Sequence, residues 1–404
     1  MGLNADAGTL HSMGCPRYVL VNHDLYYPQL LMYGANLGIK ENCVKLFETI
    51  REMGHEQVFF CHDKESDMRA IIALHDTGLG PAMGATRLWP YACEEDALRD
   101  VLRLSRGMTY KAACANIPVG GGKAVIIANP ENKTDGLLRA YGRFVDSLKG
   151  RFITGQDVNI SLEDVRKIRG ETSYVVGVSK KAGEPVVTTA LGVFLGIKAA
   201  VEFRLQKKEL HELKVAVQGI GNVGKNLCKQ LHEYGVRIFV SDLKKDNTEE
   251  VKHLYGATVV DTNEIYSLDV DVFAPCALGG ILNSSTIPLI KAPIIAGAAN
   301  NQLEDEQIHS RLLQSKEILY CPDYVINAGG LINVYNEMIG SDEEKTLKQL
   351  NNIYHSLLDI FRRAKEEGIT THEAAKHLAE ERIMRAKNSC FLGVSAFRTS
   401  ALQC

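Results

Sequence analysis

Two lysines on either side of a glycine run are the first residues whose types and spacing could do chemistry. Lys111 and Lys123 enclose an apolar stretch that ends in three glycines at residues 120–122. The run is not a phosphate-binding P-loop, because Ile117 occupies the position of the first glycine and Ala124 that of the serine or threonine. A glycine-rich turn lets a small substrate approach a lysine, and burial lowers the pKa of an amine, so such a lysine can exchange protons. A solvated surface lysine is the alternative, but the pair favours a site.

An acidic residue, Asp157, follows a short apolar stretch at residues 152–154. Loops at strand ends are where α/β proteins place chemistry, which makes this carboxylate a candidate for proton transfer. An aspartate after Gly-Gln is equally ordinary in a turn. Taken alone, the residue does not decide between the two interpretations.

A GxGxxG run at residues 218–224 follows a predicted strand at 214–217 and opens a predicted helix at 222–234. In such a unit the first glycine permits the tight turn, the second admits the pyrophosphate, and the third lets helix and strand pack closely. Asp242 ends the next predicted strand and would accept hydrogen bonds from the adenosine ribose, while its charge disfavours a 2′-phosphate. The unit therefore predicts a site for NAD rather than NADP. A plain strand–turn–helix corner is the alternative.

Three further loops follow predicted strands of the same unit, at residues 274–280, 296–302 and 324–333. In an open parallel sheet the ligand binds beyond the carboxyl ends of the strands, so these loops should face the nicotinamide. Tight turns without function explain one such loop but poorly explain three. The residues that these motifs assign to cofactor binding are Gly219, Ile220, Gly221, Asn222, Val223, Gly224, Asp242, Cys276 and Ala277.

Composition narrows the class of protein. The chain has 404 residues, a formal net charge of -3 and 45% hydrophobic residues, which predicts a folded protein of about two domains. The near-neutral balance provides no basic field for nucleic acid or for an anionic membrane surface. No run approaches eighteen uninterrupted apolar residues, and the amino terminus lacks the pattern of a signal peptide, so we expect a cytoplasmic protein without membrane spans.

The ten cysteines contain no CxxC pair. Their spacing fits neither a zinc ribbon nor a disulfide framework, so we expect no metal site and a reducing compartment.

Apolar periodicity places these motifs on alternating helices and strands, which argues for an α/β architecture. Strands are predicted at 58–61 and 70–74 as a hairpin or adjacent pair, and at 123–127, 152–154, 214–217, 237–240, 270–274, 294–296 and 318–321. Helices are predicted at 94–114, 134–148 with Thr134 as N-cap, 192–203 and 222–234, and the tail 343–386 is predicted to be helical throughout.

The sequence resembles the glutamate/leucine/phenylalanine/valine dehydrogenases, most closely the leucine dehydrogenase branch. The resemblance extends over about residues 44–387 and includes the segments GPAMGATR (80–87), MTYKAA (108–113), GGGKA (120–124), GIGNVG, APCALGG, AANNQL and PDYVINAGG. Within that branch it is most similar to the cyanobacterial members that act on L-tryptophan.

The family implies two domains with the active site in the cleft between them. An α/β catalytic and oligomerisation domain is expected at 44–187, and an NAD-binding Rossmann domain at 188–338. A helical segment at 339–404 should return to the first domain. A homo-oligomer, favouring a dimer, is implied by analogy.

The resemblance also implies roles for single residues. Lys111 matches the lysine that pairs with the substrate α-carboxylate, Lys123 the catalytic lysine, and Asp157 the acid that shuttles the amine proton. Thr189 matches a threonine that contacts the nicotinamide amide, and Asn300 an asparagine near the cofactor. The implied reaction is oxidative deamination of an L-amino acid, in which Lys123 activates water for attack on an imine and Asp157 relays protons.

The residues beside these motifs are mostly apolar, which predicts a pocket for a large hydrophobic side chain. No further cation is evident for a side-chain carboxylate, so glutamate is disfavoured. Tyr335 and the small Ala112 favour an aromatic substrate, tryptophan before phenylalanine or leucine. Each of these residues could instead be ordinary core. The predicted substrate contacts besides Lys111 are Met83, Gly84, Ala112, Ile117, Ile153, Leu331, Ile332 and Tyr335.

Two departures from the family pattern stand out. Asn159 and Ile160 occupy positions where the leucine branch often has Gly-Thr, which could alter the catalytic loop. Residues 1–43 match nothing in the family and form an extension of unknown role. The motifs are also compatible with a leucine-type or phenylalanine-type enzyme and, in a different class of function, with an inactive NAD-binding regulatory protein.

Overall fold

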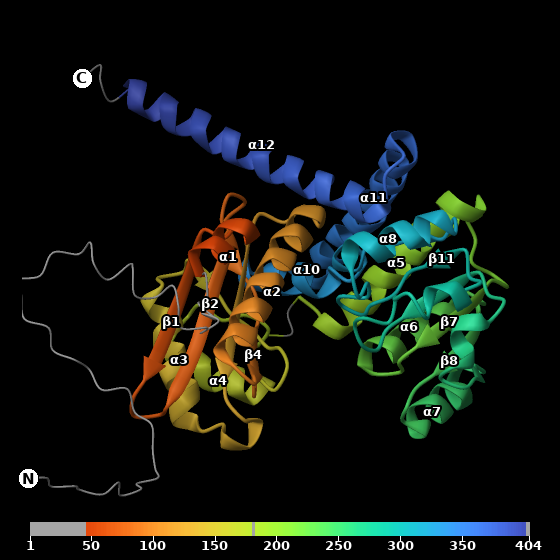
Figure 1. Ribbon diagram of the computed structural model, residues 1–404, viewed down its shortest axis with the longest axis horizontal. Coiled ribbons are helices and arrows are strands. Elements are labelled where there is room, and N and C mark those ends of the chain that lie inside the picture. Colours follow the sequence, from red (N-terminus) through yellow and green to blue (C-terminus); the bar gives the residue numbers. More distant parts are fainter. Residues whose placement is uncertain (1–45, 180–181, 401–404) are drawn as a thin grey trace, which may run out of the picture. The chain divides into compact units, whose positions relative to one another are not determined.

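The computed structural model describes residues 46–179 and 182–400, and in them the chain forms two six-stranded sheets with their helices (Figure 1). The predicted extension at 1–43 lies outside the described residues. The elements of the first sheet and its helices are α1 (Leu46–Met53), β1 (Gln57–Asp63), β2 (Met68–Asp76), β3 (Ala82–Met83), β4 (Thr86–Trp89), α2 (Glu94–Cys114), β5 (Gly120–Ile127), α3 (Asp135–Ser147), β6 (Phe152–Ile153) and α4 (Leu162–Arg169).

The first sheet is mixed, with the order β1-β2-β5-β3-β6 and with β4 also paired to β5. β1 and β2 form the predicted antiparallel hairpin, whose turn includes Asp67 in the left-handed region. The segments β3, β5 and β6 run parallel, so the ends of these strands bring residues from distant parts of the sequence to one edge. This edge positions the candidate catalytic residues.

The predicted helices of this part are confirmed. α2 spans the predicted residues, and its buried face includes Leu98, Val101 and Leu102. The N-cap of α3 is Thr134, as predicted, since its hydroxyl oxygen accepts a hydrogen bond from the backbone N–H of Leu137 at 3.2 Å. α3 therefore begins where the capping chemistry of Thr134 predicts its start.

The glycine run at 120–122 is not a turn, and this corrects the sequence interpretation. β5 begins at Gly120, three residues before the predicted strand. A Cβ on Gly121 would overlap Thr109 of α2, and one on Gly122 would overlap the ring of Phe152. The glycines therefore allow α2 and the ring of Phe152 from β6 to pack closely on β5, so protein atoms occupy the space beside Gly121 and Gly122.

The second sheet is entirely parallel, with the order β12-β11-β10-β7-β8-β9. The strand order reverses at the neighbouring strands β7 and β10: β8 and β9 are added on one side of β7, and β10, β11 and β12 on the other. This is the topological switch point at which doubly wound sheets bind ligands. The elements are α5 (Pro185–Leu205), β7 (Lys214–Gln218), α6 (Asn222–Glu233), β8 (Arg237–Ser241), α7 (Lys245–Tyr255), β9 (Thr258–Val259), β10 (Val272–Pro275), β11 (Ile294–Ile295), α8 (Glu306–Ser315), β12 (Leu319–Tyr320), α9 (Asp323–Ile326) and α10 (Gly329–Met338).

The predicted strands of this sheet are all present, with ends shifted by one or two residues. β9 was not predicted, because its two residues are exposed and show no apolar pattern. α5 begins seven residues before the predicted helix, at Pro185 in the first turn, where the missing N–H of proline costs nothing.

By length and composition alone, α5 is the one helix among the described residues that could cross a membrane, with 56% of its most apolar window buried. It packs against α6, α10 and α11, so its apolar surface is covered by other helices. This packing is that of a core helix.

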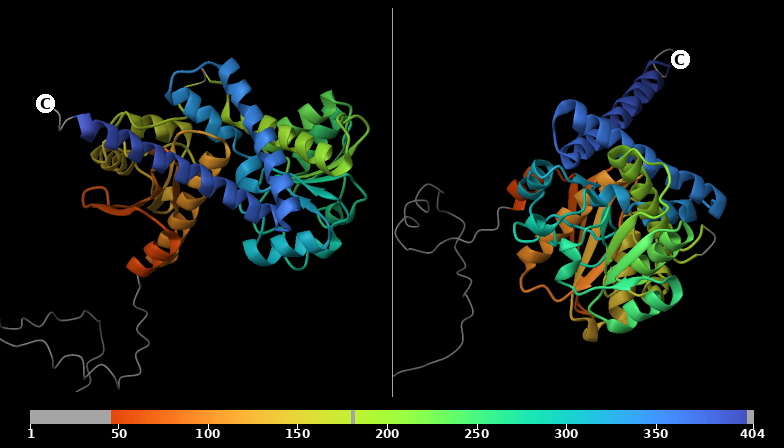
Figure 2. Two further views of the ribbon diagram at one scale, coloured as in Figure 1. Left: turned by 90° about the horizontal axis from the view of Figure 1, so that it is seen from above. Right: turned by 90° about the vertical axis from the view of Figure 1, so that its right-hand side faces the viewer.

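The carboxyl-terminal segment is helical with one break. α11 (Glu343–Glu367) ends at Gly368, which adopts a φ of 70° as its C-cap, and α12 (Thr371–Ser400) follows. α11 packs on α5 and α10 beside the second sheet, whereas α12 packs on α2 beside the first (Figure 2). The segment therefore contacts both halves of the molecule.

Candidate active site

Lys123 and Asp157 form an ion pair, with the lysine Nζ 2.8 Å from the carboxylate Oδ2. Lys123 lies in β5 and is 5% exposed, an unusual degree of burial for a lysine. Asp157 lies in the loop that follows β6. Since β5 and β6 both pair with β3, the sheet brings the two residues together.

Arg87 is a third member of this cluster, to which the sequence interpretation assigned no role. Its Nε donates to the Oδ2 of Asp157 at 3.3 Å, and its Nη1 donates to the Oδ2 of Asp100 at 2.9 Å. The hydroxyl of Tyr91 donates to the same oxygen of Asp100 at 2.5 Å. In the sequence, the only indication of a role for Arg87 was its position at the end of the GPAMGATR segment.

The charges around Asp157 favour its ionised form. Burial acts to raise the pKa of the carboxyl, but attraction by Lys123 and Arg87 outweighs it, and the pKa lies below its ordinary value. The carboxylate is therefore available as a proton acceptor near neutral pH.

Lys111 is in the last turn of α2 and belongs to the same electrostatic environment. Burial lowers the pKa of its amine to about 8, although the carboxylate of Asp323 attracts the positive charge. Asp323 is the first residue of α9, which follows β12 of the second sheet. Burial raises the pKa of its carboxyl despite the attraction of Lys111. An amine of this kind can pair with an anion while remaining sensitive to pH.

The departure at Asn159 is compatible with an unchanged loop. Asn159 adopts a φ of 57°, a conformation that asparagine tolerates better than other residues with a Cβ. Its side-chain amide donates to the carbonyl oxygen of Leu88 at 3.0 Å. The residue therefore takes the backbone conformation for which glycine is suited and ties the loop of Asp157 to β4.

The glycine loop between β7 and α6 fits a dinucleotide. Gly219 has a φ of 93°, and a Cβ there would overlap Ala277. A Cβ on Gly224 would overlap the carbonyl oxygen of Gly219, whereas none of the described atoms lies within 4 Å of a Cβ on Gly221. The first and third glycines are thus required by packing, and the second leaves open space at the start of α6, where a phosphate is favoured.

Asp242 follows β8 and holds this loop in place. Its carboxylate accepts hydrogen bonds from the backbone N–H of Ile220 at 2.6 Å and of Lys244 at 2.7 Å. Each carboxylate oxygen can accept more than one hydrogen bond, so these contacts leave capacity for ribose hydroxyls. The residues present fit the adenosine half of a nicotinamide dinucleotide.

Of the other predicted cofactor residues, Cys276 and Ala277 follow β10, Asn300 follows β11, and Thr189 lies in α5. The Thr189 hydroxyl donates to the carbonyl oxygen of Pro185 at 2.7 Å, within α5. Ala277 packs against Gly219, and burial raises the pKa of the Cys276 thiol to about 12, so that it stays neutral. The Asn300 amide oxygen accepts a hydrogen bond at 2.7 Å from Asn327, a buried residue to which the sequence interpretation assigned no role.

The predicted substrate contacts are mostly buried core. Gly84 packs against β5, because a Cβ there would overlap the backbone of Gly122. Tyr335 is partly exposed and packs against a single hydrophobic cluster. That cluster contains Met83, Ala112, Ile117, Ile153, Leu331 and Ile332. The cluster includes residues from both halves of the chain, and their burial is that of core residues.

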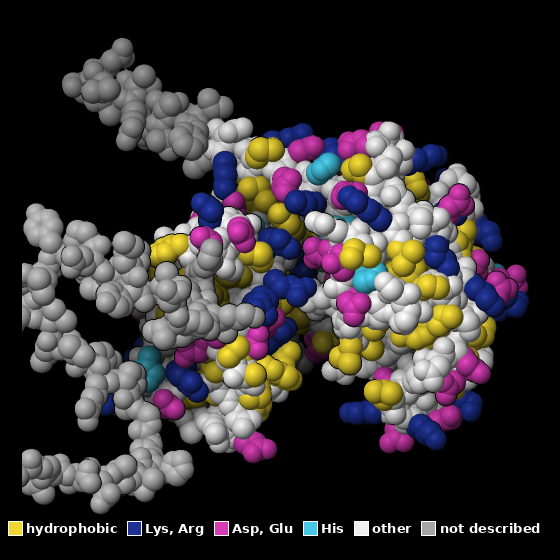
Figure 3. Space-filling model, in the orientation of Figure 1, with side chains coloured by type: hydrophobic (Ala, Val, Ile, Leu, Met, Phe, Trp, Pro, Cys, Tyr) yellow, Lys and Arg dark blue, Asp and Glu magenta, His cyan; other side chains and the backbone are white. Residues whose placement is uncertain are grey.

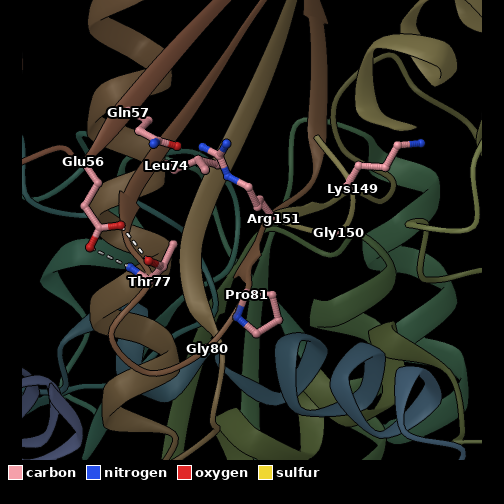
Figure 4. Close-up of a pocket in the computed structure, with 9 residues that line it drawn as sticks. All are labelled: Glu56, Gln57, Leu74, Thr77, Gly80, Pro81, Lys149, Gly150 and Arg151. Carbon is pink, nitrogen blue, oxygen red and sulfur yellow. Dashed lines mark hydrogen bonds between the residues drawn. The ribbon is translucent and has the colours of Figure 1, made fainter. Parts of the chain in front are cut away.

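A cavity of about 370 Å³ lies elsewhere, at the beginnings of β3 and β6 (Figure 4). Asp157 follows the other end of β6, so the cavity is at the opposite edge of the sheet. It is lined by Glu56, Gln57, Leu74, Thr77, Gly80, Pro81, Lys149, Gly150 and Arg151.

On the face shown in Figure 3, basic and acidic side chains are interspersed. Within residues 46–179 and 182–400, no group of three or more His, Cys, Asp or Glu side chains is placed to hold a metal ion.

The fold and site define a two-sheet α/β protein with a dinucleotide loop and a lysine–aspartate pair. Residues 55–178 match the model of the Glu/Leu/Phe/Val dehydrogenase dimerisation domain, and residues 239–389 that of the glutamate/leucine/phenylalanine/valine dehydrogenases. An L-tryptophan dehydrogenase of Nostoc punctiforme is 72% identical over 351 residues, covering 87% of this chain and 99% of the relative. A leucine dehydrogenase of Geobacillus stearothermophilus is 47% identical over 355 residues, covering 86% and 96%.

A crystal structure of L-tryptophan dehydrogenase from Nostoc punctiforme superimposes with a TM-score of 0.77 at 71% identity, covering 85% of this chain and 99% of that one. The chain therefore belongs to the glutamate/leucine/phenylalanine/valine dehydrogenase family. It is an amino-acid dehydrogenase, and its cofactor is a nicotinamide dinucleotide.

Proposed function

We propose that the protein catalyses the reversible, NAD-dependent oxidative deamination of a hydrophobic L-amino acid, with L-tryptophan preferred, to its 2-oxo acid and ammonia. The observation that carries the proposal is the ion pair between the buried Lys123 and the half-buried Asp157, in a chain 72% identical to an L-tryptophan dehydrogenase.

We assign Lys111 to the substrate α-carboxylate, because a partly buried amine on a rigid helix provides a charge of fixed position. A bound NAD would supply the acceptor for the hydride of the substrate Cα, and the imine left on the substrate would then be hydrolysed. Lys123 then activates water for attack on that imine. Asp157, held ionised by two cations, accepts and returns the protons as ammonia leaves.

For the cofactor, we assign the loop of Gly219, Gly221 and Gly224 to the pyrophosphate and Asp242 to the ribose. Thr189, Cys276, Ala277 and Asn300 are assigned to the nicotinamide half, together with loop residues Ile220, Asn222 and Val223. A carboxylate at the ribose favours NAD, because it repels the 2′-phosphate of NADP.

For the substrate side chain, we assign the apolar residues where the two halves of the chain meet. These are Met83, Gly84, Ala112, Ile117, Ile153, Leu331, Ile332 and Tyr335. We further propose that the protein is a cytoplasmic homodimer, since residues 55–178 match a dimerisation domain. Sedimentation equilibrium of the full chain measures the mass of the assembly.

A substrate panel tests the function. Tryptophan, phenylalanine and leucine are each assayed with NAD and with NADP by NADH or NADPH absorbance, at saturating cofactor. The highest kcat/KM is expected with tryptophan and NAD. Faster turnover of leucine or of phenylalanine would make that amino acid, and not tryptophan, the preferred substrate. NAD binding without turnover of any amino acid would favour the regulatory alternative.

A further inference from the structure

Arg87 is a half-buried residue of β4 that contacts two carboxylates at once. Its guanidinium lies between Asp157, which follows β6, and Asp100, which lies on α2. The two contacts use different nitrogens, Nε and Nη1, so the position of the group is fixed at both ends. The planar guanidinium of arginine can hold two carboxylates through different nitrogens in a fixed geometry, which the ammonium of lysine does not reproduce.

The contact with Asp157 is made to the same oxygen that pairs with Lys123. Oδ2 lies 2.8 Å from the Nζ of Lys123 and 3.3 Å from the Nε of Arg87. With two cations on one oxygen, the carboxylate cannot rotate without losing both contacts. The second oxygen, Oδ1, has neither of these two cations as a partner.

The contact with Asp100 ties this arrangement to α2. Asp100 also accepts a hydrogen bond from the hydroxyl of Tyr91, so its carboxylate is itself held from two sides. The same helix carries Lys111 in its last turn. Arg87 thereby connects the loop of the proposed proton acceptor to the helix of the proposed substrate-binding lysine.

We propose that Arg87 is a positioning residue for the deamination: it orients the Asp157 carboxylate against Lys123 and stabilises its charged form. The inference rests on the proposed function, in which Asp157 accepts protons. It assigns Arg87 no contact with the substrate or the cofactor.

The charge of Arg87 makes this role distinguishable from a purely structural one. A nearby cation lowers the pKa of a carboxylate by about 1 to 3 units, so its removal should raise the pH at which Asp157 becomes protonated. The acid limb of the kcat profile would move to higher pH. A residue that only supports the fold would lower kcat or stability without moving the profile.

The test uses the full-length enzyme and the best substrate from the panel, with kcat and KM measured across pH. Arg87→Gln is expected to lower kcat about 10- to 100-fold, which is part of what a positioned acid–base group contributes. It should also shift the acid limb of the profile to higher pH by about 1 pH unit or more. The KM for NAD should change less than about 2-fold. Arg87→Lys should restore the position of the acid limb while kcat stays reduced, because the charge returns without the second contact.

Two further variants keep the test decisive. Asp100→Asn leaves the cation in place but loosens it, so kcat should fall without a shift of the profile. Arg143→Gln is the matched control, because Arg143 is an exposed arginine of the same half of the chain that pairs with Asp63 and Glu171. It should leave kcat and the profile unchanged. If thermal denaturation shows that Arg87→Gln is not folded, the test rests on Arg87→Lys and Asp100→Asn.

An Arg87→Gln enzyme with wild-type kcat, or with lowered kcat and an unmoved acid limb, would overturn the proposal. If Arg87→Gln does not fold, wild-type kcat in both other variants would do so. These results are separate from a failure of the proposed function, which the wild-type enzyme reveals by turning over none of the amino acids in the panel.

Discussion

The side-chain amide of Asn333 donates a hydrogen bond to the carbonyl oxygen of Ala182 at 2.6 Å. Ala182 lies in the segment that connects α4 to α5 and thus the first sheet to the second, while Asn333 lies on α10. One helical turn further along, the carboxylate of Glu337 accepts hydrogen bonds from the backbone N–H groups of Gly177, Val178 and Ser179, each at 3.0 Å. α10 therefore holds the connecting segment from both sides of residues 180–181.

Replacement of Glu337 should loosen this segment. Because three backbone donors lose a charged acceptor, Glu337→Ala should lower the free energy of unfolding by about 2 kcal/mol. Urea denaturation measures the change, and limited proteolysis should cut the segment faster. Glu344→Ala is the control, since the exposed Glu344 pairs with the exposed Lys348 one turn away. Equal stability of the two variants would contradict the anchoring role.

Lys123→Ala should reduce kcat by at least about 100-fold, because it removes the amine that activates water. Binding of NADH, followed by fluorescence, should stay within about 2-fold of wild type, since Lys123 lies on the first sheet and the dinucleotide loop on the second. Asp157 keeps its contact with Arg87 in this variant. Substantial remaining turnover would remove the lysine from the mechanism.

Asp242→Ala should raise the KM for NAD about 10-fold or more, the loss expected for a charged hydrogen bond. It should also raise the ratio of kcat/KM for NADP to that for NAD, because the repulsion of a 2′-phosphate disappears. Asp242→Asn is the informative control, since an amide oxygen can still accept one hydrogen bond from Ile220 or Lys244. Unchanged kinetics with NAD in the alanine variant would refute the ribose contact.

Acid sensitivity is expected from two buried histidines. Burial lowers the pKa of both His55 and His75 from 6.5 to about 4, and their rings lie 4.9 Å apart. Between about pH 4 and about pH 6.5 the unfolded chain binds more protons than the folded one, so stability should rise with pH across this window and be lost as the pH falls. Each histidine contributes up to about 1.4 kcal/mol per pH unit.

Urea unfolding at several pH values between about 4.5 and about 6.5 measures this slope. His75→Gln should flatten it, because one of the two groups no longer titrates, whereas His211→Gln at an exposed position should not. The same slope in His75→Gln and wild type would contradict the assignment.

Local sequence patterns predicted those helices, strands and turns whose positions depend on residues close together in the sequence. The strand, glycine turn and helix around Gly219 follow from backbone needs that only glycine meets, and the N-cap of α3 follows from the hydroxyl of Thr134. β9 escaped prediction because its two exposed residues show no apolar pattern. The glycines of β5 were interpreted as a turn because residue type alone does not show that Thr109 of α2 and Phe152 of β6 pack against them.

The sequence by itself determined the kinds of groups available for catalysis and the loop that suits a dinucleotide, because residue type and short-range spacing set both. Only the tertiary structure decided that Arg87, Lys123 and Asp157 meet at one carboxylate oxygen, and that Asn327 holds Asn300. These contacts depend on strand pairing between segments far apart in the chain. Their energies come from burial and charge at distances of a few ångströms, which spacing along the chain does not specify.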